Sequence, residues 1–155
     1  MLSTRLVTMI EDHAEELSRD LIRDVKTNNH TVHFQRSSHD ELRELAFGVY
    51  RNLGDWLSHS KEEAIDTTYS KLASDRFAEG IPLSEVVYAL ILTKEHLRDY
   101  VRSSGLLDTA VELYQEQELR TLVGRFFDKA IYYTVRGHER EAARRNSKGS
   151  HPNAA

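Results

Sequence analysis

The chain has 155 residues, 30% of them charged, and a formal net charge of −4. This length suits one domain with a substantial core, and the mild negative charge gives no overall attraction to nucleic acid or anionic membranes. Because cysteine is absent, disulfides, thiolate metal sites and a cysteine nucleophile are excluded. Arg5 and Glu11 interrupt the N-terminal apolar stretch, so it does not match a signal peptide, and we expect a cytoplasmic protein with no membrane span.

The N-terminal part of the chain predicts one amphipathic helix followed by a loop. The helix is expected over about residues 3–27, where apolar side chains recur at steps of three or four: Leu6, Ile10, Ala14, Leu17, Leu21 and Val25. Residues 28–37 show no periodicity and predict a loop. With only two prolines and seven glycines in the chain, an all-α fold is the simplest interpretation.

Two further helices begin at capping signals. Ser38 and Glu41 form the pattern of a capping box, in which the serine accepts from the Glu41 amide and the carboxylate reaches back to the Ser38 amide. Ser60 repeats this pattern at the start of a third helix, expected to run to about residue 78. Gly80 then ends that helix at a position where a positive φ is usual.

A run of seven apolar residues, Val86 to Leu92, marks the central element. It has no polar face and is expected to be buried on all sides. Leu97 and Val101 extend its apolar row at steps of three and four, which favours one helix of about five turns. Ser84 is the expected cap. The fold class is therefore an all-α single bundle of five to six helices around a buried central helix.

The last part of the chain predicts a short helix near Asp108 and a long C-terminal helix over about residues 115–145. The long helix carries two adjacent apolar rows, a wider face than one core contact needs. The surplus indicates a partner, and a symmetric homodimer would bring the same patch against itself. The candidate interface residues are Phe126, Phe127, Ala130, Tyr133 and Gly137. Residues 1–145 then form one helical domain, and 146–155 a disordered tail.

The sequence does not single out a catalytic or metal site. No nucleophile, base and orienting group stand at a specific spacing, so we expect no enzyme. His30, His33 and His39 lie in and after one loop without the further ligands that zinc requires, so no metal is expected. The candidate ligand pocket is Tyr88, Leu92 and His96 on the central helix. A lone imidazole facing an apolar cavity is able to ligate haem, which leaves haem or small-ligand sensing through His96 as an alternative.

A second alternative is a transcription regulator. The turn from Ala78 to Ser84 followed by a helix is similar to helix-turn-helix DNA readers. A recognition helix has to present polar side chains to the bases and phosphates. The run from Val86 to Leu92 presents none, and we therefore expect no nucleic-acid partner.

The segment Ala73 to Leu90, the spaced Leu97 and the later Phe126 to Ile131 resemble the helical N-terminal sensor domain of the RsbR-type stressosome co-antagonists. A similar domain precedes many bacterial histidine kinases. The resemblance extends from the first helix to about Arg140, and it depends on an arginine, an acid-Gly-x-Pro-Leu turn and an apolar helix. It implies a haem-free, globin-like module that dimerises and passes a signal through its last helix to a downstream module.

The resemblance thus predicts a non-enzymatic bacterial signalling module of the stress-response or two-component kind. Its expected partners are a second copy of the chain and a downstream signalling protein. Two arrangements stay open, a stand-alone regulator and the sensor portion of a longer protein. The sequence identifies neither the signal nor the output.

Overall fold

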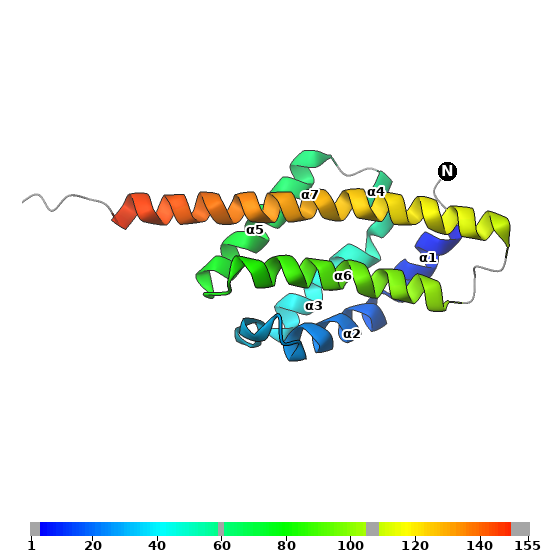
Figure 1. Ribbon diagram of the computed structural model, residues 1–155, viewed down its shortest axis with the longest axis horizontal. Coiled ribbons are helices and arrows are strands. Elements are labelled where there is room, and N and C mark those ends of the chain that lie inside the picture. Colours follow the sequence, from blue (N-terminus) through cyan, green and yellow to red (C-terminus); the bar gives the residue numbers. More distant parts are fainter. Residues whose placement is uncertain (1–3, 59–60, 105–108, 150–155) are drawn as a thin grey trace, which may run out of the picture.

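The computed structural model describes residues 4–58, 61–104 and 109–149, and every regular element within these ranges is helical (Figure 1). An all-α bundle with a long C-terminal helix was predicted and is confirmed. The described elements, in chain order, are α1 (Thr4–Asp12), α2 (Ala14–Thr27), the 3-10 helix η1 (Val32–Arg36), α3 (His39–Arg51), α4 (Leu53–Ser58), α5 (Glu62–Ala78), α6 (Leu83–Ser103) and α7 (Ala110–Gly149).

The predicted first helix is in fact two helices, which is one reason why the described ranges hold more helices than expected. The chain leaves the helical conformation at His13, where φ is −107° and ψ is 18°. The His13 amide donates to both Met9 O and Ile10 O at 3.2 Å. This break lets α1 contact α4, while α2 lies along α3 and α6. Both helices bury apolar residues on the same stripe, so the spacing carries no sign of the break.

The predicted second helix also breaks, at Asn52. Its φ of −111° and ψ of 25° separate α3 from α4. The Asn52 side-chain amide donates to Gly48 O at 3.0 Å, a local bond of the type with which asparagine competes against helix continuation. Leu53 is fully buried directly after the break, so α4 starts on a core contact.

Three of the predicted helix boundaries can be compared with the structure. The Ser38 side chain accepts from the Glu41 amide, as expected, although the Glu41 carboxylate binds Arg76. Gly80 has a φ of 75°, as predicted for the end of α5. The predicted cap at Ser84 is wrong, because Pro82 occupies the N-cap of α6 with no side-chain bond. The expected cap at Ser60 lies outside the described residues.

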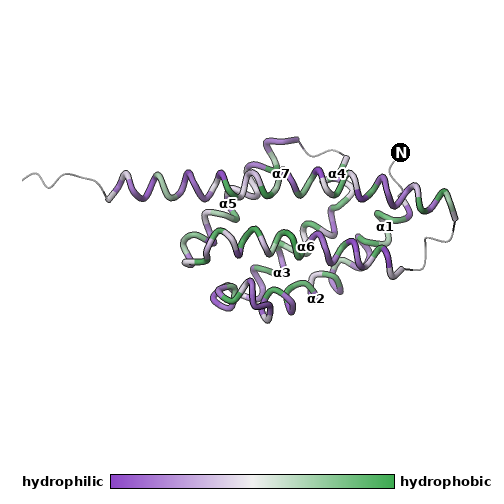
Figure 2. Tube along the Cα trace, in the orientation of Figure 1, coloured by the Kyte–Doolittle hydropathy of each residue, from purple (hydrophilic) through white to green (hydrophobic). Residues whose placement is uncertain are grey.

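Helix α6 lies between α7 and α2, with α5 and α1 also in contact (Figure 1). The prediction of a central helix is therefore confirmed. Complete burial of the run from Val86 to Leu92 is wrong: Val86, Leu90 and Leu92 are buried and the other four side chains are half-buried. Figure 2 shows the hydrophobic first half of α6 and its more polar C-terminal half. One side of the apolar run keeps some contact with solvent.

Helix α7 is continuous from Ala110 to Gly149, in place of the expected short helix and longer helix. Residues 105–108, at the expected start near Asp108, are outside the described ranges. Of the predicted disordered tail, residues 146–149 are helical and 150–155 are not described. In Figure 1, α7 runs alongside α6, and its C-terminal end extends beyond the rest of the bundle. None of the described helices is both long and apolar enough to cross a bilayer.

Candidate functional site

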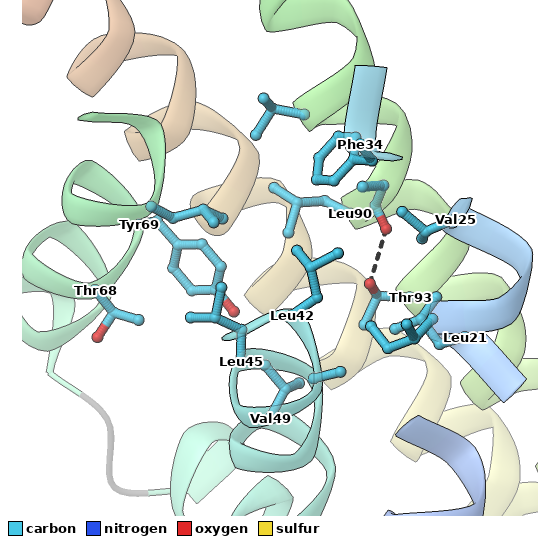
Figure 3. A pocket seen from close by; sticks show the side chains of 15 residues that line it. Leu21, Val25, Phe34, Leu42, Leu45, Val49, Thr68, Tyr69, Leu90 and Thr93 are labelled. Atoms are coloured by element: carbon cyan, nitrogen blue, oxygen red, sulfur yellow. Dashed lines mark hydrogen bonds between the residues drawn. The ribbon is translucent and has the colours of Figure 1, made fainter. Parts of the chain in front are cut away.

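The candidate site is an apolar cavity of about 80 Å³ between α2, η1, α3, α5 and α6 (Figure 3). Apolar side chains form most of its wall, with Leu21 and Val25 from α2, Phe34 from η1 and Leu90 from α6 among them. Each helix contributes the side chains of its core-facing stripe, and the cavity is the space these stripes leave unfilled. The space is partly open to solvent, with Leu45 of its wall exposed at the surface.

Tyr69 is the notable polar residue in the wall. Its hydroxyl is buried and has no hydrogen-bond partner among the described residues. Burial raises the pKa of the Tyr69 hydroxyl, which therefore remains a neutral donor. The ring itself is held by Trp56, with centroids 6.4 Å apart, and by Phe126 of α7 at 6.0 Å. An unpartnered buried hydroxyl costs free energy, so this one has an unused capacity for a hydrogen bond.

The other buried polar groups on this side of the core are paired. Thr93 Oγ1 donates to Ala89 O at 2.8 Å, a bond drawn in Figure 3. The Tyr50 hydroxyl donates to Thr93 O at 2.8 Å. The pKa of Tyr50 is raised, mainly by burial and to a lesser extent by the nearby Tyr69, so its hydroxyl also stays neutral. Tyr69 thus differs from Tyr50, which is equally buried but has its partner.

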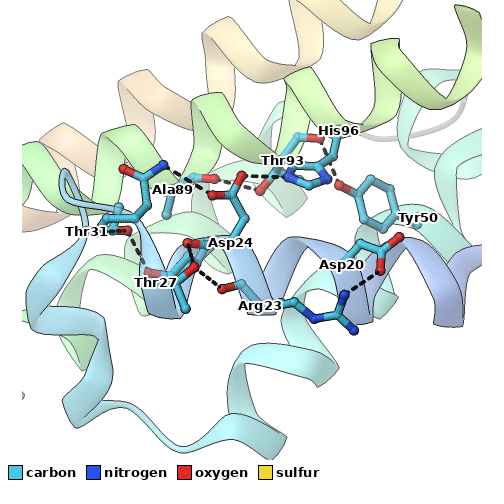
Figure 4. Close-up of polar contacts among 11 residues, drawn as sticks. Asp20, Arg23, Asp24, Thr27, Thr31, Tyr50, Ala89, Thr93 and His96 are labelled. Carbon is cyan, nitrogen blue, oxygen red and sulfur yellow. Dashed lines mark hydrogen bonds and ion pairs between the residues drawn. The ribbon is translucent and has the colours of Figure 1, made fainter.

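The predicted pocket residues do not line this cavity. The Tyr88 ring stacks on His30 with centroids 4.7 Å apart, and Leu92 lies in the core. His96 Nε2 lies 2.8 Å from Asp24 Oδ2, at the contact of α6 with α2 (Figure 4). The structure thus does not bring these three side chains together around this cavity, because His96 turns toward α2 and the cavity lies beside the Ala89, Leu90 and Thr93 side of α6.

The His96 contact also affects its partner. Partial burial acts to raise the pKa of Asp24, but hydrogen bonds from His96 and Asn28, together with the charge of His96, outweigh it. The net result is an Asp24 pKa below its ordinary value of 3.8. His96 thus has an acidic partner at a half-exposed helix contact, and it is not among the residues that line the apolar cavity.

Four of the five predicted interface residues lie inside the bundle. Phe126, Phe127, Ala130 and Gly137 are buried within the single chain. The Tyr133 hydroxyl donates to Glu62 Oε1 at 2.7 Å, and this bond to α5, together with some burial, raises the pKa of Tyr133 to about 12. The four buried side chains are therefore not a surface for a second copy, whereas Tyr133 is half-buried. The wide apolar face of α7 is covered by α4, α5 and α6, while a homodimer as such stays a prediction.

The exposed apolar residues of α7 lie elsewhere. Val111 and Tyr114 near its start are 65% and 67% exposed, and Tyr132 is 55% exposed. None of them is among the five predicted interface residues, because a sequence does not show which side of α7 the other helices cover.

Arg76, the arginine on which the resemblance depends, has a burial that sequence reasoning did not predict. Its side chain is completely buried, and it binds the carboxylates of Glu41 and of Glu79, the latter at 3.1 Å. Its Nε and Nη1 atoms have no partner among the described residues. The Ser37 hydroxyl donates to Glu79, which ties the end of the loop to the same cluster. The only signal in the sequence was the position of Arg76 just before the Gly80 turn.

The loop histidines have separate contacts. His33 binds the buried Glu85 carboxylate through its amide at 2.8 Å and through Nδ1, and His30 stacks on Tyr88. His39 begins α3. Across residues 4–58, 61–104 and 109–149, no group of three histidine or acidic side chains is placed to hold a metal ion.

Comparison with known proteins adds no relative: no protein-family model, curated protein or solved structure matches the chain. What this chain is able to do therefore has to be argued from its own fold, its cavity and the contacts of α7.

Proposed function

We propose that the chain is a non-enzymatic signalling module of the bacterial stress-response or two-component kind, which forms a homodimer and relays a signal through α7. The observation that carries this proposal is the division of α7 into two parts. Its buried side chains run from Leu119 to Glu141, and from Ala143 to Gly149 the helix is exposed. One continuous helix thus runs through the core and leaves the bundle at its C-terminal end, where a downstream protein or module would receive the signal.

The last buried residue of α7 is joined to α5 by one hydrogen bond and is paired with two arginines of α7 itself. The Glu141 carboxylate accepts from Ser74 Oγ at 3.0 Å, from Arg144 Nη2 at 2.5 Å and from Arg145 Nε at 3.0 Å. Phe77 of α5 also packs under the Arg145 guanidinium at 4.9 Å. Any displacement of α5 is therefore transmitted to the place where α7 leaves the bundle.

Helix α5 also connects α7 with the cavity. Tyr69 and Leu72 line the cavity, and the neighbouring Ser70 and Ala73 lie against α7. A change in the cavity wall thus acts on the same helix that holds α7. Small shifts of packed helices are an established form of switching.

The relay is tested with a fusion protein. A histidine-kinase catalytic core without its own sensor is joined after Gly149, and its autophosphorylation is compared with fusions that carry five or seven inserted residues at the joint. Seven residues are about two helical turns and nearly restore the rotational phase, whereas five turn the joint by about 140°. We expect altered activity with five residues and recovery with seven. Equal activity in all three fusions would contradict the relay.

The homodimer is tested by sedimentation equilibrium of the full chain. The lack of cysteine allows one spin label to be placed at Ser147→Cys on the exposed end of α7. We expect a dimer at micromolar concentration and a defined distance between the two labels. A monomer would contradict the dimer, although the relay test would still stand.

A second candidate function is sensing of a small ligand by the bundle, and the apolar cavity between α2, η1, α3, α5 and α6 favours it. The ligand would occupy the space beside Tyr69, not His96. Transcription regulation gains no support, because α6 lies between α7 and α2 and is not free to enter a DNA groove.

A further inference from the structure

We propose that two copies of the chain pair through the outer side of α7, with the two helices antiparallel and the two-fold axis between Thr121 and Leu122. This inference rests on the proposed homodimer, and it gives that dimer a surface and a direction. The surface is the part of α7 from Val111 to Tyr132 that the bundle leaves uncovered, which we call the α7 strip.

The α7 strip is where apolar side chains of α7 reach solvent. Six large apolar side chains are exposed among the described residues, and four of these belong to α7. Three of the four lie on the strip: Val111, Tyr114 and Tyr132. A shallow groove follows the middle of the strip, and Glu118, Leu122 and Arg125 are among the residues that line it. Exposed apolar residues around a groove are typical of a surface that binds another protein.

Four residues of the strip recur every seven positions: Val111, Glu118, Arg125 and Tyr132. Seven residues are about two helical turns, so these side chains lie on one side of α7, over a length of about 31 Å. Their order is apolar, acidic, basic, apolar. Reversal of the strip thus places an apolar residue opposite an apolar one and a base opposite an acid.

The outer and inner pairs follow directly from this order. In an antiparallel pair centred between Thr121 and Leu122, Val111 lies opposite Tyr132 of the second copy, and Glu118 lies opposite Arg125 of the second copy. Each pair occurs twice, because the interface of a two-fold dimer is made by the same patch on both subunits. The dimer therefore gains two ion pairs, with an apolar contact at each end of the strip.

The remaining positions of the strip fit the same centre. Tyr114 lies opposite Lys129 of the second copy, where an ammonium group over a tyrosine ring is favourable. Lys129 is exposed and Tyr114 is 67% exposed, so both side chains are available at the surface of one copy. Leu122 meets Thr121 of the second copy next to the axis.

A parallel pair of the same strips is electrostatically unfavourable. It places Glu118 against Glu118 and Arg125 against Arg125 of the second copy, and like charges directly opposite each other weaken an interface. The charge order of α7 thus selects the antiparallel direction. The two C-terminal ends of α7 then point away from each other, so that each end meets its own downstream protein.

The direction is tested with the spin label at Ser147→Cys in the full chain. Position 147 lies about 38 Å along α7 from the proposed axis, so the two labels should be about 75 Å apart. A parallel pair would bring them within about 20 Å of each other, since packed helices lie about 8–10 Å apart. A distance below about 40 Å in pulsed electron paramagnetic resonance would overturn the antiparallel arrangement.

The contacts are tested by charge reversal, with the dissociation constant measured by sedimentation equilibrium. Glu118→Arg and Arg125→Glu should each weaken the dimer about 10-fold, because two pairs turn from attraction to repulsion. The double variant Glu118→Arg/Arg125→Glu restores both pairs and should return to within about 3-fold of the wild type. Glu139→Arg, an exposed acid of α7 beyond the strip, is the matched control and should leave the dissociation constant unchanged.

The outcomes separate this inference from the proposed function. A dimer whose affinity ignores the reversals at Glu118 and Arg125, or is lost in the double variant as well, would overturn the strip and leave the homodimer in place. A wild-type chain that stays monomeric would contradict both the homodimer and the strip. Circular dichroism of each variant verifies that the bundle is folded.

Discussion

Gly137 of α7 lies directly against the backbone of Ser70 of α5: a Cβ atom at position 137 would come within 2.8 Å of Ser70 Cα and 3.2 Å of Ala73 Cβ. No side chain can be accommodated there unless the two helices move apart. The close approach of α5 and α7 thus depends on one glycine.

Gly137→Ala is expected to lower the free energy of unfolding by about 1–3 kcal/mol, the usual cost of overpacking a close contact. The control is Gly124→Ala in the same helix, where an added Cβ meets no atom within 4 Å. It should gain about 0.5–1 kcal/mol, because alanine restricts the unfolded chain more than glycine does. Urea denaturation followed by circular dichroism measures both. Stabilisation by both variants would show that the helices are not in close contact at Gly137.

Glu141 predicts a dependence of stability on pH. Hydrogen bonds from Arg144, then Arg145, and from Ser74 lower the pKa of Glu141 from 4.5 to about 2. Since the folded pKa lies below the unfolded one, its contribution to stability is complete above pH 4.5 and is lost as the pH falls from 4.5 toward 2. Thermal unfolding of the wild type and Glu141→Gln should therefore differ near neutral pH and converge at low pH. Glu139→Gln, at an exposed position, should follow the wild type throughout.

We expect removal of the two carboxylates that bind Arg76 to cost more stability than removal of Arg76 itself. Arg76 is 0% exposed, whereas the Glu41 and Glu79 side chains are 41% and 23% exposed. Removing both carboxylates in Glu41→Gln/Glu79→Gln leaves a buried uncompensated charge and should cost about 3–5 kcal/mol. Arg76→Met leaves two carboxylates that water still reaches, and should cost less than about 2 kcal/mol. Equal losses in a chemical denaturation series would argue against this account of the cluster.

The two buried tyrosines form a matched pair. Tyr50→Phe loses the bond to Thr93 O and should cost about 1 kcal/mol. Tyr69→Phe removes a hydroxyl without a partner, so without ligand it should leave stability unchanged or raise it by about 1 kcal/mol. Differential scanning calorimetry on both variants decides this. A loss in Tyr69→Phe equal to that in Tyr50→Phe would show that the hydroxyl already has a bonded partner.

The sequence predicted the helical class, the central helix and the Gly80 turn, because each depends on local spacing or on one residue type. It missed the breaks at His13 and Asn52, where the apolar stripe continues unchanged on both sides. The surplus apolar face around Phe126 was assigned to a partner, since a sequence does not show that several helices of the same chain cover α7.

The candidate site was harder to predict than the fold. Tyr69 lacks a partner for its hydroxyl because of how several elements of the bundle meet in space, which no local pattern shows. His96 was selected because it follows an apolar run, and no spacing rule shows that Asp24 faces it from α2. The burial of Arg76 likewise follows from the meeting of α3, α5 and the Gly80 turn.

The length of α7 has a mechanical consequence. If α7 tilts about its contact with α5 at Gly137, each end of the helix moves in proportion to its distance from that residue. At 1.5 Å per residue, these distances are about 18 Å to Gly149 and about 40 Å to Ala110. A tilt of about 10° would move these tips by about 3 Å and about 7 Å. The position of Gly137, which permits the close approach of α5, thus also sets the ratio of the displacements at the two ends of α7.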